Sequence, residues 1–157
     1  MLFYDICDAF KNNKIPYAIV GGYALALHGL VRATVDIDFV LHLKLTDYEK
    51  AEKCLAELGL QSRIPVRAQD IIKMRKEYIE NRNLLAWSFV DFKNPTKQVD
   101  ILINKDLKDL DIEIISFSGR KIPVASLKTL LILKQEAGRP QDLVDIENIQ
   151  RKLREKA

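Results

Sequence analysis

The sequence predicts a mixed α/β fold (α+β), in which a mixed β-sheet is flanked by helices and a pair of helices follows at the C-terminal end. Short β-prone runs alternate with segments of helical periodicity in the first part of the chain. Two later runs, 84–92 and 97–104, are separated by a turn and have the pattern of a β-hairpin, which adds antiparallel strands. From residue 126 onward, only helical patterns occur.

Local signals locate the elements of the first half. Apolar residues at positions 3, 6, 7 and 10 have helical spacing, and the glycines at 21, 22 and 59 mark breaks between elements. In chain order, the predicted elements are a helix at 3–13, a strand at 17–20, a short helix at 23–29, a strand at 34–41 and a helix at 46–58.

The second half is predicted in the same way. Asn94 and Pro95 are typical turn residues, Ser118 and Gly119 are the expected turn of a second hairpin, and the segment 138–140 separates the last two helices. In chain order, the predicted elements are a short strand at 61–64, a helix at 68–82, strands at 84–92 and 97–104, the second hairpin, and helices at 126–137 and 141–156.

Length and composition indicate a globular protein of one domain. The 157 residues are 48% hydrophobic and 30% charged, with a net charge of +3. We expect one domain over 1–157, with a catalytic core at 1–125 and a helical segment at 126–157. The mildly basic balance permits an anionic partner without requiring one.

Nothing in the sequence predicts export or a membrane span. The N-terminus lacks a basic region, and the long apolar stretch at 17–31 is shorter than the roughly 20 residues that a bilayer requires. Cys7 and Cys54 lie on apolar stripes of predicted helices and are expected to be buried, reduced thiols. We therefore predict a cytoplasmic protein without a membrane partner.

Two aspartates stand in the predicted strand at 34–41. Strand side chains alternate between faces, so Asp36 and Asp38 share one face and lie roughly 6–7 Å apart, while Ile37 and Phe39 point the other way. Two desolvated carboxylates each raise the pKa of the other, and burying them without a partner is costly. A divalent cation is a compact partner, because hard carboxylate oxygens suit Mg²⁺ or Mn²⁺.

A third acid has the same setting. Asp100 is flanked by Val99 and Ile101 in the predicted strand 97–104. If this strand lies beside the strand of Asp38, three carboxylates converge. Three acids on adjacent strands can hold two Mg²⁺ ions for phosphoryl chemistry.

The glycine pair before these acids suggests a phosphate site. Gly21 and Gly22 stand between a strand and a short helix, where glycine permits a positive φ and close backbone approach. The start of the following helix is a potential anion site. Arg32 and Thr34, just before the acids, could donate further hydrogen bonds.

In this order, the motifs resemble a known family. The segment 21–41, GGYALALHGLVRATVDIDFVL, resembles the core signature of small bacterial nucleotidyltransferases in the superfamily of DNA polymerase β-like enzymes. That group includes antibiotic nucleotidyltransferases and the toxins of abortive-infection systems. The segment 122–150 resembles the C-terminal stretch of uncharacterised members. The resemblance implies the nucleotidyltransferase fold, two Mg²⁺ ions, and transfer of a nucleoside monophosphate from NTP to an acceptor hydroxyl with release of pyrophosphate.

The resemblance also implies roles for single residues. Asp36 and Asp38 match the ligands of both metals, and Asp100 matches the third acid, which ligates the catalytic metal and helps to deprotonate the acceptor. Gly21 and Gly22 match the loop that holds the triphosphate.

Two residues of the C-terminal segment match the family pattern less specifically. Lys134 could reach a triphosphate oxygen, or it could be a solvent-facing helix lysine. Asp142 could belong to the site, or it could be the N-terminal charge of the last helix or pair with Arg139.

Other functions stay open at this stage. Aspartate-nucleophile phosphatases also carry D-x-D on a strand, but at its end and without the upstream glycines. A non-catalytic component of a toxin–antitoxin system could use the fold to bind nucleotide or a partner. The acceptor could be RNA such as tRNA, a protein or a small molecule. Two groups of basic residues could bind RNA or simply be solvated helix faces: Arg63, Arg67, Lys73, Arg75, Lys76 and Arg82, and Arg151, Lys152, Arg154 and Lys156.

Overall fold

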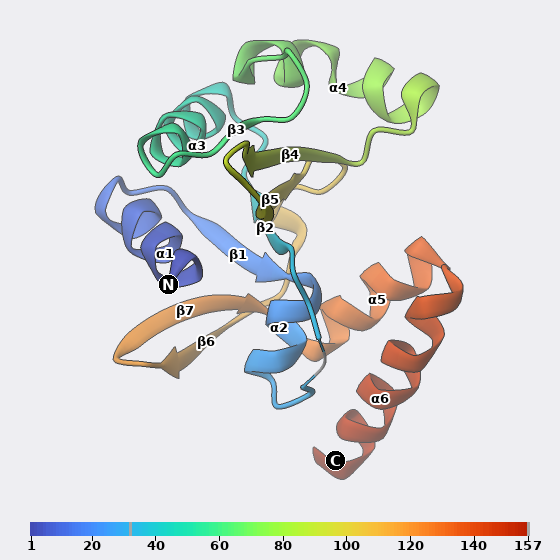
Figure 1. The fold of residues 1–157 in the computed structure, drawn as a ribbon. Helices are drawn as coiled ribbons and strands as arrows, with labels where there is room; N and C mark the ends of the chain where they lie inside the picture. The colour runs from blue at the N-terminus through green and yellow to red at the C-terminus, as the bar shows by residue number, and fades with distance from the viewer. Residues whose placement is uncertain (32, 157) are drawn as a thin grey trace.

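A computed structural model describes residues 1–31 and 33–156, and these residues form a seven-stranded mixed sheet with helices around it (Figure 1). The helices are α1 (Leu2–Asn12), α2 (Gly21–Leu27), α3 (Leu45–Glu57), α4 (Ala68–Arg82), the 3₁₀ turn η1 (Leu107–Asp109), α5 (Leu127–Ala137) and α6 (Pro140–Lys156). The strands are β1 (Tyr17–Val20), β2 (Ile37–Leu41), β3 (Gln61–Ser62), β4 (Ala86–Asp91), β5 (Asn94–Leu102), β6 (Ile112–Phe117) and β7 (Arg120–Ala125).

The sheet has the order β3-β4-β5-β2-β1-β7-β6. The predicted hairpins β4–β5 and β6–β7 are antiparallel, β1 runs antiparallel to β2, and the pairs β2–β5 and β1–β7 are parallel. This mixed pairing confirms the predicted fold class. It also places β2 and β5 side by side near the middle of the sheet.

Aromatic side chains fill one face of the sheet. Phe10 of α1 packs edge-on against Phe39 of β2 at a centroid distance of 5.2 Å, and Tyr48 of α3 stacks on Trp87 of β4 at 6.0 Å. These buried rings hold α1 and α3 against the sheet. The cysteines of the same two helices are free and buried, as predicted.

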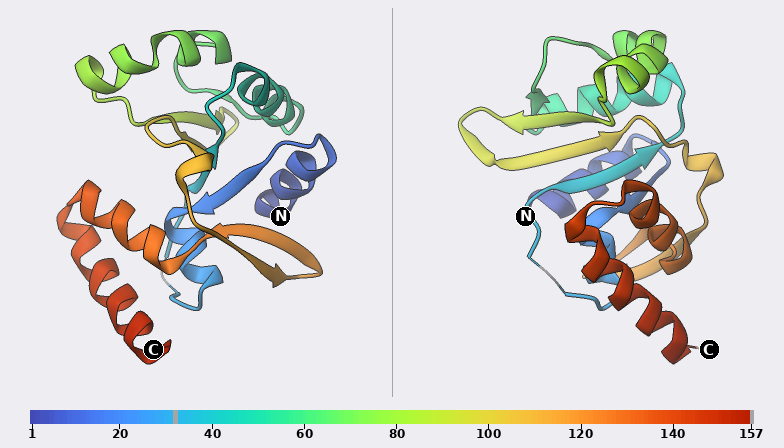
Figure 2. Two further views of the ribbon diagram at one scale, coloured as in Figure 1. Left: turned by 180° about the vertical axis from the view of Figure 1, so that it is seen from behind. Right: turned by 90° about the vertical axis from the view of Figure 1, so that its right-hand side faces the viewer.

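The α5–α6 pair lies on the other side of the sheet from α1 (Figure 2). The Ser126 hydroxyl caps α5 by accepting a hydrogen bond from the Thr129 N–H at 3.1 Å. Gly138, with a φ of +61°, ends α5, and α6 begins two residues later. No helix among the described residues is long and apolar enough to cross a membrane.

Three predicted boundaries were wrong. The strand predicted at 34–41 begins only at Ile37, where the pairing with Val99 of β5 starts; the pairing with β1 starts at Asp38, opposite Val20. The helix after β1 begins at Gly21 instead of residue 23. Asn94 and Pro95 belong to β5, and the turn is at residues 92–93; Pro95 is tolerated near an irregular, exposed end of the hairpin.

Candidate active site

Two of the three predicted acids lie side by side on adjacent strands in the middle of the sheet. Asp38 of β2 is the register partner of Asp100 of β5, and Val20, the last residue of β1, is the partner of Asp38 on its other side. Because Phe39 packs toward α1 and strand side chains alternate, Asp38 points to the side of α5 and α6. Asp36 lies just before β2, outside the strand in which it was predicted.

The acids perturb one another. Burial, the charge of Asp100 and a hydrogen bond shared with it raise the pKa of Asp38 to about 8, while Lys134 opposes this rise. Burial and the charge of Asp100 also raise the pKa of Asp36, with Arg63 acting in the opposite direction. Among the described residues, no basic side chain forms an ion pair with these acids. Ionising the three acids together is therefore unfavourable unless a cation lies close to them.

The donor types fit magnesium or manganese, which prefer carboxylate oxygens. Within residues 1–31 and 33–156, however, no three carboxylate, imidazole or thiol groups are arranged as a metal cluster. Mg²⁺ is commonly held by one or two carboxylates together with the phosphates of a substrate. The fit of this site to Mg²⁺ or Mn²⁺ therefore rests on the carboxylate oxygens of the three acids.

The glycine pair packs directly against the acid segment. Gly21 has a φ of +69°, and a Cβ there would lie 2.1 Å from Oδ2 of Asp38. A Cβ on Gly22 would lie 2.6 Å from Oγ1 of Thr34. Both positions therefore require glycine for close approach to neighbouring side chains, a purpose that the sequence did not reveal.

Thr34 is held near the acids, since its hydroxyl donates to the backbone carbonyl of Asp36 at 3.3 Å. Arg32, the other predicted donor in this segment, lies outside the described residues.

Lys134 is buried and not a solvent-facing lysine, with only 8% of its surface exposed. Its Nζ pairs with Asp142 at 3.1 Å and with Asp145 at 3.0 Å, which ties α5 to α6. Asp142 also accepts hydrogen bonds from the backbone N–H of Arg139 at 3.1 Å and from its Nε at 2.9 Å. These bonds outweigh burial and lower the pKa of Asp142 to about 2.

Sequence reasoning missed one polar group beside the acids. The Nε2 of Gln98 donates to Oδ1 of Asp100 at 3.1 Å, and Oε1 of Gln98 accepts from Nη2 of Arg63 at 2.7 Å. Gln98 precedes Asp100 by two residues on β5, and this spacing on one strand face was the available signal.

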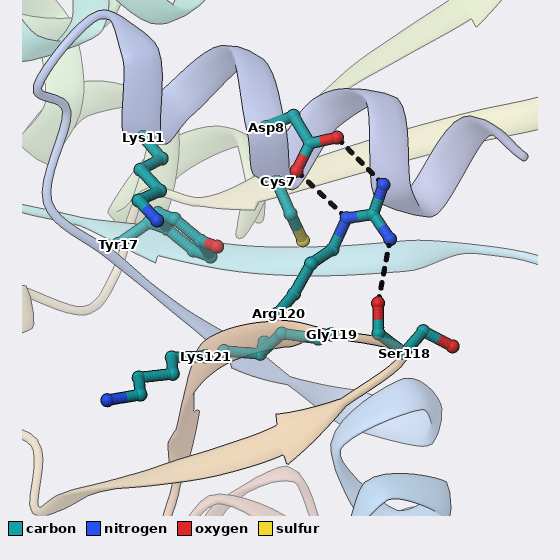
Figure 3. Close-up of a pocket in the computed structure, with 9 residues that line it drawn as sticks. Cys7, Asp8, Lys11, Tyr17, Ser118, Gly119, Arg120 and Lys121 are labelled. Atoms are coloured by element: carbon teal, nitrogen blue, oxygen red, sulfur yellow. Dashed lines mark hydrogen bonds and ion pairs between the residues drawn. The ribbon is translucent and has the colours of Figure 1, made fainter.

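A cavity lies at the Tyr17 end of β1, the opposite end from Val20, which pairs with Asp38; Figure 3 shows the residues that line it. It has a volume of about 370 Å³ and lies between α1 and the β6–β7 hairpin. Arg120 crosses it and pairs with both carboxylate oxygens of Asp8 at 2.9 Å. This cavity contains none of the predicted site residues.

Solved structures of similar fold include several nucleotide-transferring proteins. The lincosamide antibiotic adenylyltransferase LnuA, solved with lincomycin, has a TM-score of 0.64 and 17% identity, over 95% of this chain and 94% of that one. ANT(2'')-Ia, in complex with adenylyl-2''-tobramycin, has a TM-score of 0.63 and 14% identity, over 94% of this chain and 84% of that one. A candidate nucleotidyltransferase from Thermotoga maritima has a TM-score of 0.58 and 17% identity, over 98% and 91%.

At these identities, the solved structures establish the fold alone. A search of curated proteins gives no significant match. The family model described as nucleotidyl transferase AbiEii toxin, type IV toxin–antitoxin system, matches residues 2–155. The chain therefore belongs to the AbiEii family of nucleotidyltransferase toxins.

Proposed function

We propose that this chain transfers a nucleoside monophosphate from an NTP to an acceptor hydroxyl and releases pyrophosphate, with Mg²⁺ as cofactor. The observation that carries this proposal is the pairing of Asp38 with Asp100 on adjacent central strands, in a chain of a nucleotidyltransferase family. Asp36 completes a set of three carboxylates that influence one another's charge.

In this proposal, Asp36 and Asp38 hold two divalent ions, and Asp100 holds the catalytic one; Mn²⁺ can replace Mg²⁺. The ions supply Lewis-acid stabilisation of the phosphates. Asp100, half-buried and next to Asp38 in the sheet, would take the proton of the acceptor hydroxyl. The hydroxyl oxygen forms a bond to the α-phosphorus as the bond to the bridging oxygen breaks, and pyrophosphate leaves with that electron pair.

The nucleotide would lie along the same face of the sheet. Gly21 and Gly22 let the start of α2 lie close to Asp38 and Thr34, so a triphosphate held at this turn would be near the acids, and Thr34 and Arg32 would add donors. Lys134 acts from α5 as a fixed positive charge, since it already influences Asp38 electrostatically. We assign the chemistry to residues 1–125 and the placement of Lys134 to the helical segment 126–157.

The class of acceptor is to be identified by experiment. The neighbours of similar fold include a lincosamide antibiotic adenylyltransferase with bound lincomycin and ANT(2'')-Ia with adenylyl-2''-tobramycin, which makes a small molecule one candidate acceptor; RNA, including tRNA, and proteins are further candidates. The family description adds a toxin–antitoxin setting, with an antitoxin as a potential partner. Two free, buried cysteines suit the reducing cytoplasm, where we place the protein.

The experiment is transfer of label from each α-³²P-NTP, with Mg²⁺, to total RNA, total protein and small hydroxyl compounds. The wild type is compared with the Asp36→Ala/Asp38→Ala variant. Label transferred by the wild type alone would support the proposal and identify both nucleotide and acceptor class. Nucleotide-dependent stabilisation without transfer to any acceptor would favour a component that binds nucleotide or a partner without turnover.

A further inference from the structure

A row of register partners leads from the edge of the sheet to the acids. Arg63 continues β3, and its N–H donates to the Ser88 carbonyl of β4 at 2.9 Å. Ser88 is the partner of Asp100 in β5, and Asp100 is the partner of Asp38 in β2. Directly opposed residues share a sheet face, so Arg63 and both acids lie on the same side.

The small Ser88 side chain leaves space for Arg63 to reach across β4 to β5. There the guanidinium donates to Oε1 of Gln98 at 2.7 Å, and Nε2 of Gln98 donates to Oδ1 of Asp100 at 3.1 Å. A guanidinium only donates, and an ionised carboxylate only accepts. The amide of Gln98 therefore has a single orientation that satisfies both neighbours. The three groups form a hydrogen-bonded chain that runs from Arg63 through Gln98 to Asp100.

We propose that Gln98 and Arg63 are positioning residues for Asp100, an inference that rests on the proposed function. Asp100 is only half-buried, so its carboxylate could rotate if nothing held it. The bond from Gln98 to Oδ1 orients this carboxylate, which also shares a hydrogen bond with Asp38. A metal that replaced the shared proton would then meet a ligand that is already oriented. Arg63 fixes the amide of Gln98 and, as a cation on the same face, also moderates the negative charge around Asp36.

A purely structural role is the competing explanation, because the same bonds tie the segment after β3 to β5. The two explanations differ in what they predict for metal binding. Hydrogen-bond partners of metal ligands typically contribute about 10- to 100-fold to metal affinity. A bond that only secures a surface segment would change thermal stability and leave metal affinity as it was.

The test measures binding of Mn²⁺ together with α,β-methylene-ATP, by the electron paramagnetic resonance signal of free Mn²⁺, and so does not depend on turnover. The variants are Gln98→Met, Arg63→Met and the double variant. Arg63→Lys retains the charge and one donor. Arg67→Met is the matched control, since Arg67 belongs to the same segment but pairs with Glu52 at 2.9 Å. Asp100→Asn reports on the acid itself.

We expect Gln98→Met and Arg63→Met each to weaken Mn²⁺ binding by about 10-fold, because both interrupt the same chain. For that reason the double variant should be no weaker than Gln98→Met. Arg63→Lys should recover most of the affinity, and Arg67→Met should bind as the wild type does. All variants should retain the melting temperature within a few degrees, because both side chains lie near the surface.

Wild-type affinity in Gln98→Met, with affinity reduced in Asp100→Asn, would overturn the positioning role and leave the proposed function intact. Wild-type affinity in Arg63→Met alone would remove Arg63 from the chain. If the wild type bound no Mn²⁺ with this analogue or with those of the other three bases, the proposed function would be overturned along with this inference.

Discussion

Replacing Gly21 by alanine tests whether the glycine pair exists to accommodate Asp38. The new Cβ would lie 2.1 Å from Oδ2, 3.0 Å from Cγ and 3.2 Å from Cβ of Asp38. These distances require movement, either of the α2 backbone or of the carboxylate. Movement of the carboxylate takes Asp38 out of its place beside Asp100, and movement of the backbone shifts the turn that contacts Asp38.

Gly59 provides a matched control for the backbone part of the effect. It has a φ of +85°, and a Cβ there would meet nothing within 4 Å. A left-handed φ costs a residue with a side chain about 1–2 kcal/mol, so Gly59→Ala should lose that amount of stability. Gly21→Ala should lose about 1–3 kcal/mol more, because it also overpacks the site. Its transfer rate should fall by about 100-fold, the cost of misplacing a reacting group by roughly 1 Å.

Urea unfolding of both variants gives the free energies, and label transfer from α-³²P-NTP gives the rates. We expect Gly59→Ala to transfer label at the wild-type rate and Gly21→Ala to transfer it more slowly. Equal stability and equal rates in the two variants would refute the steric role of Gly21.

Three further outcomes concern charge. Because the pKa of Asp38 is raised, its contribution to the stability of the fold is present below about pH 4 and declines as pH rises toward 8. In the absence of metal, Asp38→Asn should therefore have a higher melting temperature than the wild type at pH 8. Identical pH profiles of the melting temperature would contradict this. Lys134→Met should destabilise the protein by about 3–5 kcal/mol in urea unfolding, because it leaves the fully buried Asp142 with an incomplete set of positive partners, and a loss below about 1 kcal/mol would contradict it. Because the pKa of Asp142 is lowered, this group stabilises the fold above about pH 4, and the stabilisation is lost as pH falls toward 2. The free energy of unfolding of Asp142→Asn should therefore depend less on pH between those values. An unchanged pH dependence would contradict the role of Asp142.

The order of elements was predictable because it depends on local patterns. The spacing of apolar residues in 3–13 and 68–82 identified both helices, and the alternation around Asp38 identified β2. The boundary at Ile37 was not predictable, because it depends on the pairing with β1 and β5, and pairing partners do not appear in a single strand's pattern.

The acids were identified by type, but their partners required the fold. Asp100 stood out as a lone acid in an apolar run, and its place beside Asp38 followed only if the two strands were neighbours, which the register confirms. The burial of Lys134 was not predictable, because helical periodicity does not distinguish a face that packs on α6 from one that meets solvent. The bond between Arg63 and Gln98 spans 35 positions, and no local pattern encodes it.

The cations that the structure describes near the acids are bound to other acceptors, and this affects the pKa of Asp38. Three cations lie near the acids, yet each has another strong acceptor: Lys134 and Arg139 bind Asp142, and Arg63 binds Gln98. If these cations instead paired with Asp38, its pKa would fall and an arriving metal would have to displace them. Because these cations are held elsewhere, the pKa of Asp38 stays raised, and a divalent ion that binds there would displace a proton rather than a cation of the protein.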